Sequence, residues 1–93
     1  MKNPALHILK ALADETRLHI VRYLLDTNEM TCQDLMKKFP LSQPTLSHHF
    51  NKLVDARILN SEKDGVLWIY RLNRLFLKES GIDIDKLTSQ NNR

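Results

Sequence analysis

Side chains that can form hydrogen bonds gather on one face of a segment in the middle of the chain. The segment reads Leu41-Ser42-Gln43-Pro44-Thr45-Leu46-Ser47-His48-His49-Phe50. At about 100° per residue of an α-helix, Leu46 and Phe50 fall on one side with Leu53 and Val54, and His48 lies opposite them. Amide, hydroxyl and imidazole groups can bond base edges in the major groove of DNA. The spacing therefore predicts a helix that packs by one face and reads DNA by the other.

Seven residues are the candidates for contact with DNA, and they fall into two groups. Those expected at base edges or nearby phosphates are Gln43, Thr45, Ser47 and His48. Gln43 can pair with adenine through two hydrogen bonds, and the methyl group of Thr45 can meet that of thymine. Those expected at phosphates, where they fix register without reading sequence, are Ser42, Lys52 and Lys63. His49 is expected at the edge of the core, with a positioning role.

A second amphipathic segment precedes this helix closely enough to form a helix-turn-helix. Thr31-Cys32-Gln33-Asp34 is a capping box, which predicts the start of a helix. Apolar positions follow at helical spacing: Cys32, Leu35 and Phe39. Pro40 disfavours helical geometry at the preceding residue, and Ser42 can cap the next helix, where Pro44 is tolerated in the first turn. For an isolated helix a solvated polar face would be the better interpretation, but the pair of helices favours DNA.

Two more helices are expected before this pair. Asn3 and Pro4 predict the start of the first helix, which has an apolar side made of Leu6, Leu9 and Leu12 or Ala13. Asp14 predicts the cap of the second helix. Its expected core positions are Leu18, Val21, Leu24 and Leu25, with Arg17, His19 and Arg22 left towards the edge or solvent.

Two strand-like runs, Ile58 to Lys63 and Val66 to Leu72, flank Asp64-Gly65, a dipeptide that suits a two-residue hairpin turn. Alternation places four residues on one face of the second run: Val66, Trp68, Tyr70 and Leu72. This face is expected to pack against the helices rather than to stack on single-stranded nucleic acid, and the turn with Lys63 would project as a wing.

Asn73 predicts the cap of a last helix through Leu75 and Phe76, and Gly81 predicts its end. The expected fold is mainly α with a small β-hairpin wing, a winged helix-turn-helix of about five helices.

Length and composition limit the possible classes of protein. With 93 residues the chain is expected to form a single domain over residues 1–93. A net charge of +3 and an isoelectric point near 9.2 permit nucleic-acid binding without requiring it. A single cysteine excludes an internal disulfide framework. The sequence has no apolar run of a membrane span and no signal-peptide pattern, so a cytoplasmic protein that does not contact membranes is expected.

Three separated motifs together resemble the ArsR-type winged-helix repressors. The motifs are Ala11-Leu12-Ala13-Asp14-Glu15-Thr16-Arg17-Leu18, the segment from Leu41 to Phe50, and Asp64-Gly65 followed by Trp68-Ile69-Tyr70-Arg71-Leu72-Asn73. The resemblance runs from about Leu6 to Asn73. It implies a homodimer built mainly from the first and last helices, and two reading helices in successive major grooves of an imperfect palindrome. It also implies transcriptional repression that a signal releases.

The chain departs from the metal-sensing members of that family, which carry Cys-x-Cys in the helix before the reading helix. Here the segment reads Glu29-Met30-Thr31-Cys32-Gln33-Asp34-Leu35, with Thr31 and Gln33 at the two ligand positions. Cys32 is expected to face inward as a small apolar residue. The chain has no histidine after His49, so the family's second metal site is also expected to be absent. We therefore expect neither a metal nor another cofactor, and the inducer stays unidentified.

Other classes of function are less well supported. His48 and His49 are adjacent, so on a helix they point about 100° apart and cannot readily chelate one zinc ion. Cys32 lacks the acidic pair or phosphate loop of an enzyme site, and the chain is not expected to be an enzyme. The stronger alternative is a winged helix used as a protein-docking module, whose polar helix face meets an acidic protein instead of DNA. Steep salt dependence with preference for one duplex would separate the two.

Overall fold

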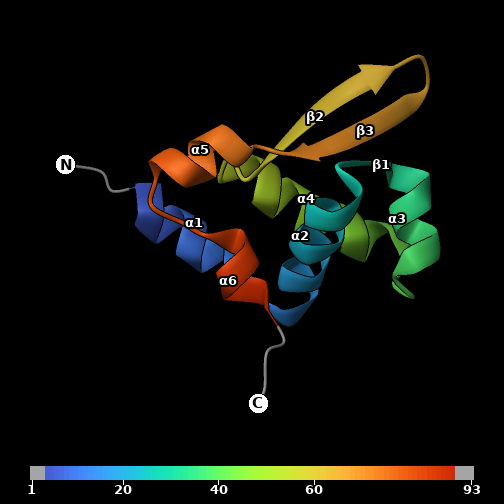
Figure 1. Cartoon of the computed structure of the whole chain (residues 1–93). Coiled ribbons are helices and arrows are strands. Elements are labelled where there is room, and N and C mark those ends of the chain that lie inside the picture. Colours follow the sequence, from blue (N-terminus) through green and yellow to red (C-terminus); the bar gives the residue numbers. More distant parts are fainter. Residues whose placement is uncertain (1–3, 90–93) are drawn as a thin grey trace.

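The computed structural model describes residues 4–89 and contains, over that range, six helices and one small sheet (Figure 1). In chain order the elements are α1 (Pro4–Leu12), α2 (Glu15–Thr27), β1 (Glu29–Thr31), α3 (Cys32–Lys38), α4 (Gln43–Asp55), β2 (Leu59–Asp64), β3 (Leu67–Leu72), α5 (Arg74–Glu79) and α6 (Ile84–Thr88). The winged helix-turn-helix is confirmed, with α3 and α4 as its helix pair and β2 and β3 as its wing. The short strand β1 was not predicted.

Short polar side chains set the starts of the helices. Asp14 caps α2 by accepting a backbone N–H at 3.0 Å, and Ser42 caps α4 by accepting one at 3.4 Å. Thr31 and Asp34 form the predicted capping box at the start of α3. Each bond satisfies an N–H that has no partner inside its helix, so local sequence alone fixes these starts. Asn3, the predicted cap of α1, lies outside the described residues.

The wing turns one residue later than predicted. β2 pairs with β3 in antiparallel register from Leu59 opposite Leu72 to Asp64 opposite Leu67, so the two-residue loop is Gly65-Val66. Gly65 has φ +65° at the first loop position, as a type II′ hairpin turn requires. The short strand β1 pairs with the other edge of β3.

The side chains of the wing depart from the prediction at its outer end. Tyr70 packs on Phe50 of α4 with ring centroids 4.8 Å apart, and Leu72 is buried, as expected for the helix-facing side. Val66, however, is 89% exposed and Trp68 is 44% exposed. The hairpin extends past the helices in Figure 1, so the predicted face finds core to pack against only near its base.

A single apolar core joins the helices to the base of the sheet. Its largest fully buried side chains are Phe50, Ile8, Ile20, Leu24, Leu35, Leu46, Leu53, Ile58, Leu59 and Val21. On the apolar side expected for α1, Leu6 and Leu9 are 56% and 48% exposed, and the helix packs on the core through Ile8, Ala11 and Leu12. α1 therefore leaves an apolar side uncovered.

Candidate nucleic-acid interface

α4 has one buried face and one exposed face. The buried residues are Leu46, Phe50 and Leu53, none more than 1% exposed. The exposed candidates for DNA contact on this helix and at its cap are Ser42, Gln43, Thr45, His48 and Lys52. Ser47 is half-buried. Since the core fixes the inner face, the outer side chains are held in a constant arrangement that could enter a groove.

The first turn of α4 is organised by two hydroxyl groups. The Ser42 hydroxyl donates to Thr45 Oγ1 at 2.9 Å and accepts the Thr45 backbone N–H. The Thr45 oxygen thus accepts one hydrogen bond, while its own O–H and its methyl group stay available for contacts outside the protein. The helix N-terminus carries partial positive charge, which favours a phosphate near Ser42.

Arg17 joins α4 to α1 and to the start of α2. Its Nη1 lies 3.2 Å from His49 Nδ1 on α4 and 4.0 Å from Asp14 Oδ2, and its Nε donates to the Ala11 carbonyl. A guanidinium can only donate, so His49 Nδ1 accepts. The Arg17 side chain is 13% exposed, so of the two places expected for it, edge or solvent, it lies at the edge of the core.

Asp14 completes this cluster. Its Oδ1 lies 3.8 Å from His49 Nδ1, and the His49 side chain is 12% exposed, in agreement with the edge position predicted for it. The hydrogen bond from the Arg17 backbone N–H lowers the pKa of Asp14 and outweighs the opposing effect of burial, and the charge of the Arg17 guanidinium acts in the same direction. The carboxylate stays ionised and holds the three elements together.

The wing brings an exposed lysine and an exposed tryptophan next to the helix pair. Lys63 lies opposite Trp68 in the hairpin register, with its Nζ 5.9 Å from the centroid of the tryptophan ring. A shallow hollow of about 140 Å³ lies where the wing meets the helix pair, and it is lined by Cys32, Gln33, Met36, Gln43, Val66, Leu67 and Trp68. Gln43 and the wing therefore face the same region.

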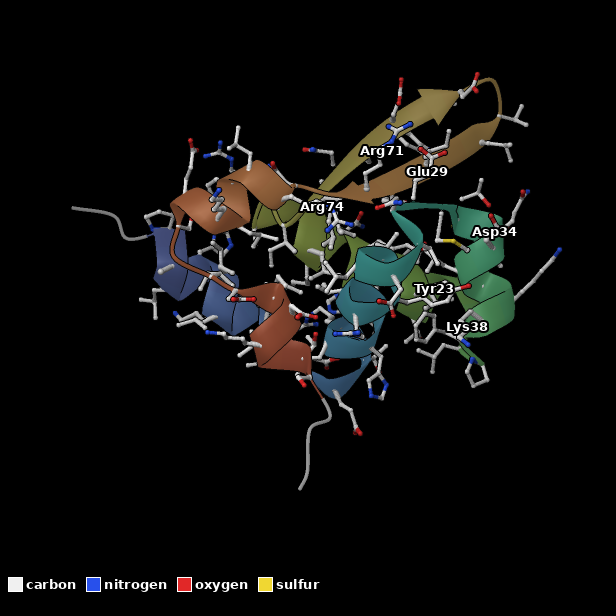
Figure 2. The ribbon with its side chains drawn as sticks, viewed as in Figure 1. Tyr23, Glu29, Asp34, Lys38, Arg71 and Arg74 are labelled. Carbon is white, nitrogen blue, oxygen red and sulfur yellow. The ribbon has the colours of Figure 1, made fainter. Side chains whose placement is uncertain are left out.

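Charged side chains outside the seven candidates shape the rest of this surface. Figure 2 labels Arg71 and Glu29, which form a bond of 2.8 Å between β3 and β1, and Arg71 also bonds Glu62 at 2.7 Å. These bonds raise the pKa of Arg71 and hold the three strands together. At the end of α3, Lys38 lies over the Tyr23 ring at 5.2 Å. Lys38 is a further cation beside the helix pair. Its position in the last turn of a predicted helix was the one sequence feature that could have marked it as a candidate for contact with DNA.

The positions that carry metal ligands in the metal-sensing relatives have other roles here. The Thr31 hydroxyl caps α3, and Gln33 is exposed. Cys32 is half-buried and packs against the core, with its Sγ 4.0 Å from Met36 Sδ. Burial raises the pKa of the Cys32 thiol, which disfavours the thiolate that binds metals. Over residues 4–89 no three His, Cys, Asp or Glu side chains gather into a group that could hold a metal ion.

A part of the sequence matches a known protein family. Residues 14–61, from the cap of α2 into β2, match the family described as bacterial regulatory protein, arsR family. The chain is 40% identical over 86 residues to the arsenical resistance operon repressor of Staphylococcus aureus, which covers 92% of this chain and 82% of the relative. It is 35% identical over 74 residues to the transcriptional repressor SdpR of Bacillus subtilis (strain 168), covering 80% of this chain and 81% of the relative.

The fold has close counterparts among solved structures. HlyU from Vibrio cholerae N16961 superposes with a TM-score of 0.78 at 34% identity, over 90% of this chain and 87% of that chain. Over the described residues, no helix has the length and apolar character needed to cross a membrane. The family expected from the three motifs is confirmed. The chain belongs to the ArsR family of bacterial regulatory proteins, and it is a winged-helix, DNA-binding transcriptional regulator rather than an enzyme.

Proposed function

We propose that the protein is a homodimeric repressor that places two copies of α4 in successive major grooves of one imperfect palindrome in double-stranded DNA. The observation that carries this proposal is the division of α4, whose inner face is anchored in the core while Gln43, Thr45 and His48 face outward. A repressor of chromosomal operators acts in the cytoplasm. If the same face met an acidic protein instead, no duplex sequence would be preferred.

The dimer interface is proposed to lie on α1 and the last two helices. Leu6 and Leu9 lie three residues apart on α1 and are both exposed, and Leu75 of α5 is 66% exposed. Leu87 of α6 is 46% exposed. α1, α5 and α6 lie on the side of the molecule away from the hairpin tip in Figure 1. Exposed leucines on neighbouring helices are typical of a surface that a second subunit covers.

The seven candidate residues keep the roles expected from the sequence. Gln43, Thr45, Ser47 and His48 are proposed to contact base edges or nearby phosphates, and Ser42, Lys52 and Lys63 are proposed to contact phosphates. For Ser42, donation to a phosphate requires that its hydroxyl leave Thr45 Oγ1, while the helix N-terminus attracts the phosphate in either case.

Gln43→Ala is expected to weaken binding to the best duplex by about 1–3 kcal/mol and to change binding to random DNA little, because only the cognate base pair uses both amide bonds. The duplex is first selected from a random pool, and affinities are then measured by fluorescence anisotropy against a scrambled duplex of equal length. His19→Ala, at an exposed position of α2 that does not line the hollow between the wing and the helix pair, is the control. An equal loss on both duplexes would remove Gln43 from base reading.

Lys63→Ala is expected to weaken binding to every duplex alike and to reduce the dependence of log K on log salt by about one unit, because one phosphate contact is lost. The affinity is measured at several salt concentrations, with Lys86→Ala on α6 as the matched control. An unchanged salt slope would place the wing away from DNA.

Arsenite, zinc and cadmium are expected to leave the protein–DNA complex intact at concentrations that do not unfold the protein. The reason is that Thr31 and Gln33 replace the two thiolates and Cys32 alone offers one partly buried thiol. Each metal is titrated against the preformed complex, with Cys32→Ser to remove any thiol reaction. Stoichiometric dissociation that a chelator reverses would show a metal site in this chain. Release would otherwise need a ligand that binds the DNA-incompetent conformation better.

A further inference from the structure

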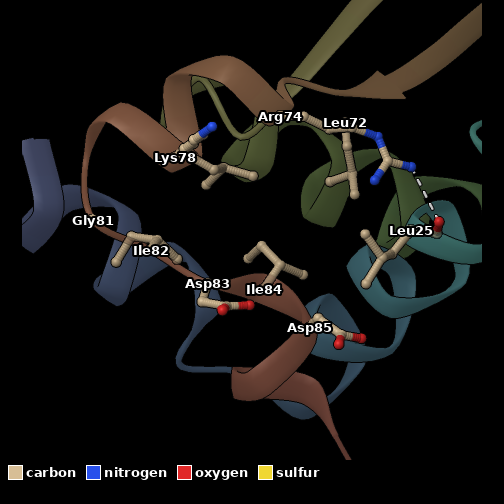
Figure 3. Close-up of a pocket in the computed structure, with 10 residues that line it drawn as sticks. Leu25, Leu72, Arg74, Lys78, Gly81, Ile82, Asp83, Ile84 and Asp85 are labelled. Carbon is tan, nitrogen blue, oxygen red and sulfur yellow. Dashed lines mark hydrogen bonds between the residues drawn. The ribbon is translucent and has the colours of Figure 1, made fainter.

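A cavity of about 470 Å³ lies between the end of α2, the end of β3, and the helices α5 and α6 (Figure 3). Its apolar wall is formed by Leu25, Leu72, Leu77, Ile82 and Ile84. Leu72, Leu77 and Ile84 are buried at its floor, and Leu25 and Ile82 are half-buried at its sides. The volume is within the range of about 300–1,000 Å³ that is usual for small-molecule sites.

The carboxylates at the rim are already engaged by the protein. Asp83 Oδ1 accepts the Lys86 backbone N–H at 3.1 Å as the cap of α6. Asp85 Oδ1 accepts from Arg22 Nη1 at 2.9 Å, which also ties α6 to α2. Asp85 is therefore paired with a cation, which it shares with Asp26, whereas Asp83 keeps its negative charge on the α6 side of the rim.

The two cations at the rim have hydrogen-bonding capacity to spare. Arg74 uses only Nη2, which donates to the Leu25 carbonyl at 3.1 Å and to Asn28 Oδ1 at 2.9 Å. Its Nε and Nη1, and the Nζ of Lys78, have no partner among residues 4–89. The two residues are four apart on α5 and so lie on one side of that helix. The α5 side of the rim therefore offers two cations with free donors, across from the carboxylate of Asp83 on the α6 side.

We propose that this cavity binds a small amphipathic anion, a carboxylate with an apolar tail, and that binding releases the repressor from DNA. The carboxylate would lie at Arg74 and Lys78, and the tail would replace water on the leucine and isoleucine wall. The release step rests on the proposed repressor function. A small inorganic anion without a tail would leave that wall uncovered.

The connection between α5 and α6 gives the ligand a way to act on the dimer. α5 ends in a Schellman motif, in which Gly81 has φ +80°, its N–H bonds the Lys78 carbonyl at 3.0 Å and the Ile82 N–H bonds the Leu77 carbonyl at 2.9 Å. Ile82, directly after this turn, is a wall of the cavity. A tail that pushes against Ile82 would shift α6 relative to α5, which carries Leu75 of the proposed dimer surface.

Sodium decanoate, below its micelle concentration, is the probe for the site. Isothermal titration calorimetry of the full chain without DNA is expected to give one decanoate per chain. Decanol should bind about tenfold more weakly, and decyltrimethylammonium should not bind measurably. Lys78→Gln should weaken decanoate about tenfold, and Ile82→Trp, which fills the cavity, should abolish binding. Lys86→Gln, on α6 but outside the lining, is the matched control and should leave binding unchanged.

Failure of the site and failure of the repressor function give different results. No decanoate binding, or equal binding of decanoate by the Lys78→Gln variant, overturns the proposal. If the unaltered protein does not bind decanoate and the Ile82→Trp variant no longer forms a dimer, the occupant of the cavity is a second copy of the chain. Decanoate binding that leaves the affinity for the selected duplex unchanged overturns the release step. Decanoate binding by a protein that prefers no duplex supports the site and overturns the proposed function.

Discussion

Leu9→Glu is expected to convert the protein into a monomer and to weaken its binding to a palindromic duplex by about 100-fold or more. Leu9 is 48% exposed on α1, so the charge can be solvated in the single chain but would be buried between two subunits. The two α4 helices then no longer act as one bivalent ligand, and the gain from linking two binding events is lost.

Sedimentation equilibrium measures the dimer, and anisotropy titrations compare the palindrome with a single half-site. Binding to the half-site should change little, because α4 is untouched. His19→Glu places the same charge on an exposed position of α2 and is the matched control. A dimer that survives Leu9→Glu would mean that the subunits meet elsewhere.

Phe50→Ala is expected to lower the free energy of unfolding by about 3–5 kcal/mol, a large part of the total stability of a domain of this size. Phe50 is 1% exposed and is the largest of the fully buried side chains. Its ring contacts Tyr70, so the change leaves a cavity between α4 and the base of the wing.

Urea unfolding, monitored by circular dichroism, measures the difference in free energy of unfolding between the variant and the unaltered protein. Phe76→Ala is the comparison, because Phe76 is only half-buried and contacts Arg57 at its surface. Its loss should be clearly smaller. If Phe50→Ala cost less than about 1 kcal/mol, α4 would not be anchored by this residue, and the constant arrangement of its outer face would lose its basis.

Local features of the fold were predictable because neighbouring residues decide them. The caps of α2, α3 and α4 follow from a side chain and the backbone N–H three residues later. Strand β1 has three residues, too few for an alternation pattern, and exists because it pairs with β3 some forty residues later. The burial of Arg17 likewise depends on Ala11 and His49, on two other elements.

The two candidate sites also differ in whether neighbouring residues in the sequence are enough to predict them. The reading face of α4 could be derived from a single helix, because helical spacing separates its polar side chains from Leu46, Phe50 and Leu53. The cavity could not be derived, because its lining comes from four elements between Leu25 and Asp85 and has no spacing of its own. The exposure of Val66 and Trp68 was not predicted, because alternation predicts which face of a strand is apolar but not where along the strand the core ends.

The contacts of Arg17 with Ala11, Asp14 and His49 have a consequence for the geometry of the operator. They fasten the end of α1 to α4, so in the proposed dimer the distance and the angle between the two reading helices are fixed by the protein. One extra base pair between the half-sites rotates one of them by about 34° around the DNA axis, since a turn holds about 10.5 base pairs. A rigid dimer cannot follow that rotation, so the protein would select operators by the length of their spacer as well as by their bases.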